Sequence, residues 1–209
     1  MNERSFQQDT SYSFMARKTD TTSPTDKGEA ILQAALELFS ERGFHGTAMP
    51  LVSERAGVSA GTIYRYFESK EALVNALYQK WKTSLLDHIL DGFPEQSPFR
   101  EQFHVFWQRY ASFALEFPMA FQFLELHHHA AYLDERSRLT EQRGHQRMVE
   151  LFHENQRLQI LKPFEVELLV AFVWGALSGV LKAGLKGEIA LTPEIIDAAE
   201  ACCWEAIRR

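Results

Sequence analysis

The stretch Ala56–Lys70, AGVSAGTIYRYFESK, places two glycines, three aromatic residues and two basic residues within fifteen positions. Gly57 interrupts the preceding helical pattern, and Ser59 is a suitable N-cap for a new helix. We therefore predict one short helix over residues 48–56 and a second over residues 59–67, joined by a glycine turn. Two such helices, with a longer helix before them, are typical of a helix-turn-helix.

The second short helix has two faces of different chemistry. At ~100° per residue, Ile63 and Phe67 share an inner face that can pack on the preceding helices. Gly61 and Arg65 lie opposite, where small residues allow a close approach to base edges and an arginine can donate to guanine or phosphate. The pattern predicts a helix that offers one side to a DNA groove, although a helical hairpin in a plain core carries similar faces.

The same stretch, with FHGT at residues 44–47 before it and EAL at residues 71–73 after it, strongly resembles the DNA-binding domain of TetR-family transcriptional regulators. The resemblance covers residues 26–77. It implies a homodimer that reads a palindromic double-stranded DNA operator, with one recognition helix in each major groove. It places these residues at phosphate-contacting positions: Thr47, Tyr64, Tyr66 and Lys70. It places these at the recognition-helix positions nearest the bases: Ser59, Ala60, Gly61, Thr62 and Arg65.

Two residues depart from the family pattern. Pro50 occupies a position where several relatives carry a polar or basic residue that reads bases, so the resemblance implies that this contact is lost here. Ser53 replaces a small apolar residue, and we expect its hydroxyl to bond back to a carbonyl oxygen. Both departures leave the operator sequence undetermined.

Beyond this region the chain continues as successive helices without a convincing alternating strand. We predict an all-α protein of about nine helices. The predicted ranges are 26–42, 48–56, 59–67, 70–91, 98–117, 118–130, 134–158, 164–186 and 193–208. The predicted domains are a disordered N-terminal arm, a three-helix DNA-binding domain, and a helical effector-binding and dimerisation domain, over residues 1–24, 25–72 and 73–209.

The net charge of −6 is distributed unevenly. Residues 15–82 carry nine Lys and Arg against eight Asp and Glu, whereas residues 83–209 carry twelve against eighteen. This distribution permits phosphate binding by the N-terminal part. It argues against a nonspecific architectural DNA binder, which needs a far more basic chain.

Cysteine usage and hydropathy bear on location. The only cysteines, Cys202 and Cys203, are adjacent, which excludes a disulfide framework and fits a reducing cytoplasm. The first residues lack the apolar stretch of a secretory signal, and we find no run of about 18 apolar residues. We therefore predict a cytoplasmic protein with no membrane partner.

Aromatic residues crowd the segment before and after Pro118. Rings at helical spacing usually belong to a plain core, yet so many rings around a proline junction also suit a cavity for an apolar or aromatic small molecule with one or two polar groups. One histidine of the run at residues 127–129 is a candidate polar anchor for such a ligand, although a solvated or capping role is favoured for these side chains. The candidate effector-binding residues are Trp107, Tyr110, Phe113, Phe123 and His128.

The run His127–His129 raises a metal alternative. Helical neighbours point ~100° apart, so three consecutive imidazoles do not converge on one ion. Glu125 and His129 form a better pair, but no further ligands are identifiable. We predict no metal or other cofactor, and keep a metal-dependent helical enzyme or metal sensor based on these histidines as the alternative function.

The last two predicted helices carry more apolar surface than one core-facing stripe needs. Small residues between the large ones permit close helix contact. Two helices from each of two subunits would form a four-helix bundle, so a homodimer interface is at least as well supported as a plain core. The candidate interface residues are Phe172, Trp174, Leu177, Val180, Ile195, Ala199 and Cys202.

The leading hypothesis is a ligand-responsive, DNA-binding transcriptional regulator. By resemblance it is a repressor that binds a palindromic operator as a homodimer and is released by a small molecule. We predict no enzymatic activity, because the sequence offers no nucleophile–base pair, phosphate-binding glycine loop or spaced pair of carboxylates.

Overall fold

The computed structural model describes residues 24–127 and 131–209, and these residues form nine helices and no β-sheet. The predicted all-α fold is therefore confirmed. Most of the predicted N-terminal arm and the end of the helix predicted over residues 118–130 lie outside the described residues. The helices are α1 (Pro24–Gly46), α2 (Met49–Arg55), α3 (Ala60–Tyr66), α4 (Lys70–Leu90), α5 (Phe99–Glu116), α6 (Pro118–His127), α7 (Glu135–Arg157), α8 (Val166–Leu185) and α9 (Pro193–Ile207).

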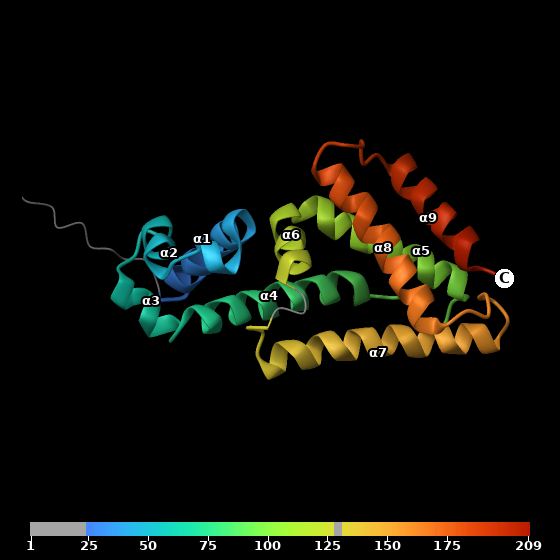
Figure 1. Ribbon diagram of the computed structural model, residues 1–209, viewed down its shortest axis with the longest axis horizontal. Helices are drawn as coiled ribbons and strands as arrows, with labels where there is room; N and C mark the ends of the chain where they lie inside the picture. The colour runs from blue at the N-terminus through green and yellow to red at the C-terminus, as the bar shows by residue number, and fades with distance from the viewer. Residues whose placement is uncertain (1–23, 128–130) are drawn as a thin grey trace, which may run out of the picture.

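The helices form two groups joined by α4. Figure 1 shows α1, α2 and α3 together at one end of the molecule, with α5, α8 and α9 towards the other end. α4 runs from the first group to the second, where it contacts α5, and α7 packs on α8. α6 packs against α1, so the two groups also meet beside α4.

α1 extends beyond the predicted end at Arg42 because the chain bends at Gly43 and completes another helical turn. Gly43 has a left-handed backbone (φ 66°, ψ 179°), a conformation that favours glycine. The bend turns Thr47 inward, where its hydroxyl donates to the carbonyl oxygens of Gly43 at 2.9 Å and Leu38 at 3.0 Å. These bonds fix the end of α1 before α2 begins.

One apolar core holds α3 in place. Ile63 is fully buried, as are Val52 of α2 and Ile31 of α1, and all three belong to the same core cluster. Phe67 is half-buried against this cluster. The predicted inner face of the second short helix is therefore present, and α3 cannot rotate without losing buried apolar contact.

The segment between α6 and α7 is tied to α4 by Asn75, a buried residue. The Asn75 amide nitrogen donates to the carbonyl oxygens of Glu71 at 2.8 Å and Tyr132 at 3.0 Å. Its carbonyl oxygen accepts from the backbone N–H of Asp134 at 2.8 Å and the hydroxyl of Ser137 at 2.9 Å. α4 and the start of α7 are thus joined by a satisfied buried polar network.

Candidate functional sites: an exposed helix and an internal cavity

The turn between α2 and α3 is held by serine side chains. Gly57 adopts φ +66°, and the Ser53 hydroxyl donates to the carbonyl oxygen of Val58 at 2.6 Å. Ser53 therefore bonds forward across the turn, not back along its own helix as expected. Ser59 caps α3 by accepting from the N–H of Thr62 at 3.2 Å. The orientation of α3 follows from these bonds and from the burial of Ile63.

The outer face of α3 is open to solvent. Ala60, Gly61, Tyr64 and Arg65 are exposed, whereas Thr62 and Tyr66 are half-buried. The hydroxyl of Thr62 lies 2.9 Å from that of Ser59, at the start of the helix. The four exposed residues form one continuous strip of small, aromatic and cationic groups, which suits contact with a DNA groove.

Two of the residues assigned to phosphate contacts have side-chain hydrogen-bond partners within the protein. Thr47 is buried, and its single hydroxyl hydrogen is already donated to carbonyl oxygens of α1. Lys70, the first residue of α4, donates to the carbonyl oxygens of Phe44 at 2.9 Å and Thr47 at 3.0 Å. A phosphate oxygen only accepts hydrogen bonds, so a phosphate contact needs a donor. The Thr47 side chain has a single donor hydrogen, and that hydrogen is already used within the protein.

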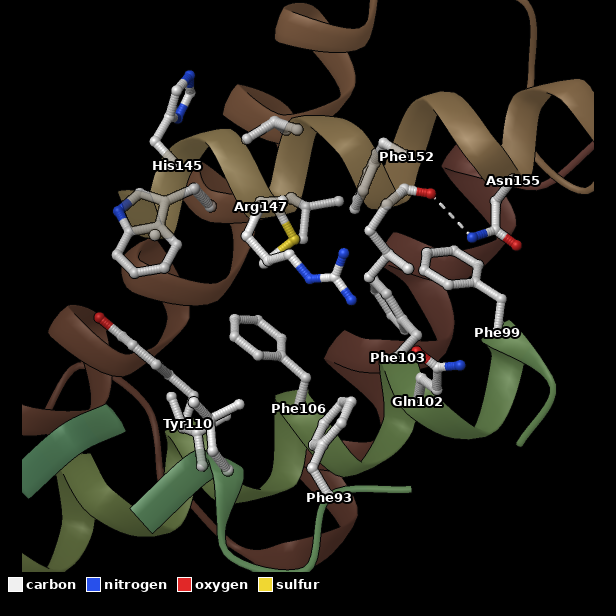
Figure 2. A pocket seen from close by; sticks show the side chains of 18 of the residues that line it. Phe93, Phe99, Gln102, Phe103, Phe106, Tyr110, His145, Arg147, Phe152 and Asn155 are labelled. Atoms are coloured by element: carbon white, nitrogen blue, oxygen red, sulfur yellow. Dashed lines mark hydrogen bonds between the residues drawn. The ribbon is translucent and has the colours of Figure 1, made fainter. Parts of the chain in front are cut away.

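A large cavity lies between α4, α5, α7 and α8, with a volume of about 980 Å³. This is at the upper end of the usual range for small-molecule sites, roughly 300–1,000 Å³. Figure 2 shows phenylalanine rings from α5, α7 and the α4–α5 connection directed into it. The aromatic residues that line the cavity are Phe93, Phe99, Phe103, Phe106, Tyr110, Phe152 and Trp174.

Only one of the predicted effector-binding residues lines this cavity. Tyr110 does so, and its ring lies edge-on to Trp174 with centroids 5.0 Å apart. Trp107, Phe113 and Phe123 are almost completely buried in the core and do not line it. His128 lies outside the described residues. The aromatic cluster around Pro118 is thus mostly core, and α7 supplies cavity residues that the sequence pattern did not single out.

Two half-buried carboxylates near the cavity are already paired. Glu141 of α7 accepts a 2.6 Å hydrogen bond from the Tyr78 hydroxyl and forms a 2.8 Å ion pair with Lys82. Glu125 of α6 pairs with Lys182 at 2.6 Å. Burial, followed by the hydrogen bond to Glu141, raises the pKa of Tyr78 well above its usual range, so this hydroxyl remains a donor at neutral pH.

His127 is the only residue of the histidine run that the structure describes. Its fully buried ring lies beside Phe123 and Phe39, with centroids 4.5 and 6.0 Å away, and its Nδ1 is hydrogen-bonded to the Tyr132 hydroxyl. Burial lowers the pKa of His127 to about 4, so the imidazole is neutral at pH 7. The described part of the chain contains no group of three or more His, Cys, Asp or Glu suited to a metal ion.

The candidate dimer residues do not all lie on one surface. Phe172 and Ile195 are 47% and 42% exposed, Cys202 is exposed, and Val180 and Ala199 are half-buried. Leu177 lies in the core, and Trp174 borders the cavity. Among the described helices, α8 alone has the length and mean hydropathy, 1.8, of a helix able to cross a membrane, although Glu167 and Lys182 interrupt its apolar residues. A soluble core helix passes the same test, and α8 contacts α5, α7 and α9.

The fixed α2–α3 turn, the exposed face of α3 and the separate helical body with its cavity define a helix-turn-helix regulator. The model of the N-terminal domain, described as bacterial regulatory proteins of the tetR family, matches residues 31–77. A second model, described as a tetracyclin repressor-like C-terminal domain, matches residues 78–209. The chain therefore belongs to the TetR family of transcriptional regulators, whose members are regulators and not enzymes.

Individual relatives agree with this assignment. The chain is 43% identical over 63 residues to the uncharacterized HTH-type transcriptional regulator YvdT of Bacillus subtilis, covering 30% of this chain and 32% of that protein. It is 50% identical over 54 residues to the regulator RutR of Escherichia coli K12, covering 26% of each. These matches span about a third or less of the relatives' length. A TetR family regulator from Marinobacter aquaeolei superimposes with a TM-score of 0.77 at 25% identity, covering 87% of this chain and 95% of that one.

Proposed function

We propose that the protein is a cytoplasmic repressor that binds a palindromic operator as a homodimer and releases it when a small molecule fills the cavity. In this proposal the exposed face of α3 enters the major groove. The cavity between α4, α5, α7 and α8 is the effector site. No membrane, metal or enzymatic step is involved.

The observation that carries the proposal is the course of α4. This 21-residue helix begins at Lys70, which is bonded to the end of α1, and its last turns line the cavity through Leu85, Leu86, Ile89 and Leu90. At about 1.5 Å per residue the helix is ~31 Å long. A ligand that moves the cavity end of α4 therefore also acts on the DNA-contacting end, because one continuous helix joins them.

The homodimer is supported by the apolar surface of α8 and α9. Phe164, just before α8, and Leu168 and Phe172 within it are 55%, 58% and 47% exposed. A Cβ added at Gly175 or Gly179 would meet no neighbouring atom, so a second helix can approach there closely. Pairing α8 and α9 with their copies would bury this surface in a four-helix bundle.

A homodimer explains why we expect the operator to be a palindrome with two half-sites. Two copies of α3 held ~34–36 Å apart reach successive major grooves on one side of the DNA. A shift of α4 that changes this separation by several ångströms would break contact with one half-site. The effector needs only to bind the shifted conformation more tightly for release to follow.

The proposal is tested by footprinting the purified protein on the DNA flanking its own gene, with and without a panel of small molecules. We expect a symmetric footprint that at least one compound abolishes, and a reporter placed behind this DNA that is silenced until the compound is added. Arg65→Ala should need a higher protein concentration to give the footprint, whereas Arg138→Ala on α7 should give it at the wild-type concentration. Indifference of the wild-type protein to all DNA would contradict the proposal, and increased reporter expression would identify an activator instead.

A further inference from the structure

Arg147 of α7 extends into the cavity. Figure 2 shows its guanidinium directed from α7 towards the side of the cavity from which Phe103 and Phe106 of α5 project. Among the described residues, Arg147 has no hydrogen-bond or ion-pair partner. Arg147 is also solvent-exposed, as is the neighbouring Gly144, so the cavity is open along α7 and a ligand can enter there.

Arg147 differs from the paired charges beside the cavity. Lys82 is neutralised by Glu141, and Glu141 also accepts from Tyr78, so both are satisfied without a ligand. A ligand that fills the cavity would remove water from the Arg147 guanidinium. Burying an unpaired charge is costly, so the ligand that fits best supplies an anion at this point.

The rest of the cavity lining is suited to an apolar group of a ligand. Phe93, Phe103, Phe106 and Phe152 line the same cavity as Arg147, and Leu, Ile, Val and Met side chains add further apolar surface among the polar residues of the lining. A small inorganic anion would leave these rings in water. A wholly apolar compound would cover the guanidinium without a counter-charge. Only a ligand with both parts satisfies the site.

We propose that the effector is an amphipathic carboxylic acid whose carboxylate pairs with Arg147 and whose apolar chain lies among the phenylalanine rings. This inference rests on the proposed function, which makes the cavity the effector site. An arginine fork can hold a carboxylate through two parallel hydrogen bonds. Arg143, one helical turn earlier, also lines the cavity and adds a second positive charge on the same side of α7.

Acidic residues of the lining define the competing chemistry. Glu95, Glu154 and Glu167 also border the cavity, and none of them is paired with Arg147. If these carboxylates dominated the field in the cavity, an amphipathic amine would bind better than an acid. The head group of the preferred ligand therefore distinguishes the two cases directly.

Titration calorimetry of the full-length protein with decanoate, decanol and decylamine, each below its micelle concentration, tests the proposal. We expect decanoate to bind at least tenfold more tightly than decanol, and decylamine to bind most weakly. Binding should tighten about fourfold per added methylene from hexanoate to decanoate, because each group moves from water to the rings. Equal binding of decanoate and decanol, or a preference for decylamine, would overturn the proposal.

Two variants locate the charge that selects the acid. Arg147→Gln should lose most of the preference for decanoate over decanol, because it removes this cation and leaves only Arg143 and the aromatic lining. Arg138→Gln lies on the same helix but outside the cavity, and should keep the wild-type preference. Thermal melting confirms that both variants fold. An unchanged preference for decanoate in folded Arg147→Gln would remove Arg147 from the site.

The same samples separate this inference from the proposed function. Operator binding with no head-group preference in the cavity would overturn the ligand class and leave the regulator intact. Arg147-dependent binding of decanoate that leaves the operator complex unchanged would support the ligand class and contradict release by this ligand. Arg147-dependent binding with release supports both.

Discussion

The ammonium group of Lys70 donates a 2.9 Å hydrogen bond to the carbonyl oxygen of Phe44 and lies 4.1 Å from the centre of the Phe44 ring. The same ring stacks on Tyr132 with centroids 4.0 Å apart. Lys70 therefore closes the end of α1 at the point where the first helix group meets the α6–α7 segment. Its position by sequence suggested a phosphate contact, but its observed partners are carbonyl oxygens and a ring.

Replacement of Lys70 by Met should reduce stability more than it reduces the charge-dependent part of DNA binding. The change removes the ammonium donor from the carbonyl oxygens of Phe44 and Thr47, of which Phe44 keeps a backbone bond from the N–H of Thr47, and we expect a cost of about 1–3 kcal/mol. For a chain of this size each kcal/mol corresponds to ~2–4 °C in Tm. Differential scanning fluorimetry measures this loss, and Lys186→Met, at an exposed lysine, serves as the control.

The salt dependence of operator binding separates this structural role from a phosphate contact. If Lys70 neutralised a phosphate, its loss would reduce the slope of log K against log salt by about one. We expect the slope of Lys70→Met to equal that of the wild type. A reduced slope with an unchanged Tm would reverse the assignment.

Arg65→Ala should weaken operator binding by about 1–3 kcal/mol and relax selection at one base position. Arg65 is exposed at the end of α3, with its guanidinium 5.5 Å from the centre of the Tyr66 ring. Arg55→Ala is the matched control, because Arg55 is held by a 2.7 Å ion pair with Glu37. Selection from a randomised operator library gives both quantities. Equal weakening on operator and random DNA would show that Arg65 contacts only phosphate.

Phe172→Glu should convert the proposed homodimer to a monomer. The substitution places a charge in the centre of the exposed apolar face of α8, where it would be buried without a partner in the dimer. Light scattering at micromolar concentration should give a mass near 24.1 kDa for the variant and twice that for the wild type. Leu139→Glu, at a similarly exposed leucine of α7, should remain dimeric. A monomeric wild-type protein would contradict the interface.

His127 should make the protein less stable in mild acid. Its pKa is about 4 in the folded protein and ~6.5 in the unfolded chain, so between these values the unfolded chain binds the additional proton. Stability contributed by the neutral ring is therefore complete above pH ~6.5 and falls by up to ~1.4 kcal/mol per pH unit towards pH 4. Urea unfolding near pH 7.5 and pH 5 measures this loss.

Two variants isolate the contribution of His127 from that of other titrating groups. His127→Phe keeps an aromatic ring between Phe39 and Phe123 but does not titrate, so it should lose less stability than the wild type over this range. His145→Gln, at an exposed histidine of α7, should follow the wild type. Identical pH dependence of wild type and His127→Phe would show that the buried ring does not control the effect.

The architecture of α3 could be predicted from sequence because its information is local. The 3.6-residue period separates Ile63 from Arg65, and Ser59 and Gly57 mark the start of the helix and the turn before it. The inward positions of Thr47 and Lys70 could not be predicted in this way. Their partners are carbonyl oxygens near the bend at Gly43. The periodicity of the side chains does not indicate which backbone carbonyl oxygens are available as acceptors at such a bend.

The cavity illustrates the same limit. Tyr110 was identified from an aromatic cluster, but Arg147 and Phe152 belong to α7, which looks like a solvated helix because it is mostly polar. Whether a residue of α7 faces solvent or a cavity depends on the distance between α7 and α4, which is set by packing at α8 and by Asn75. The position of Leu177 in the core could not be predicted from sequence either, because an apolar side chain suits a dimer interface and a core equally well.

The inward bonds of Thr47 and Ser53 have a consequence for how this protein can evolve. These side chains fix the backbone of the first helix group, whereas Tyr64, Arg65 and the rest of the exposed strip of α3 carry no contact on which that backbone depends. Mutations in the strip can therefore alter the preferred DNA sequence at little cost in folding. Under the proposed function, a duplicated gene could acquire a new set of target promoters through a few substitutions in this strip without any change in the cavity.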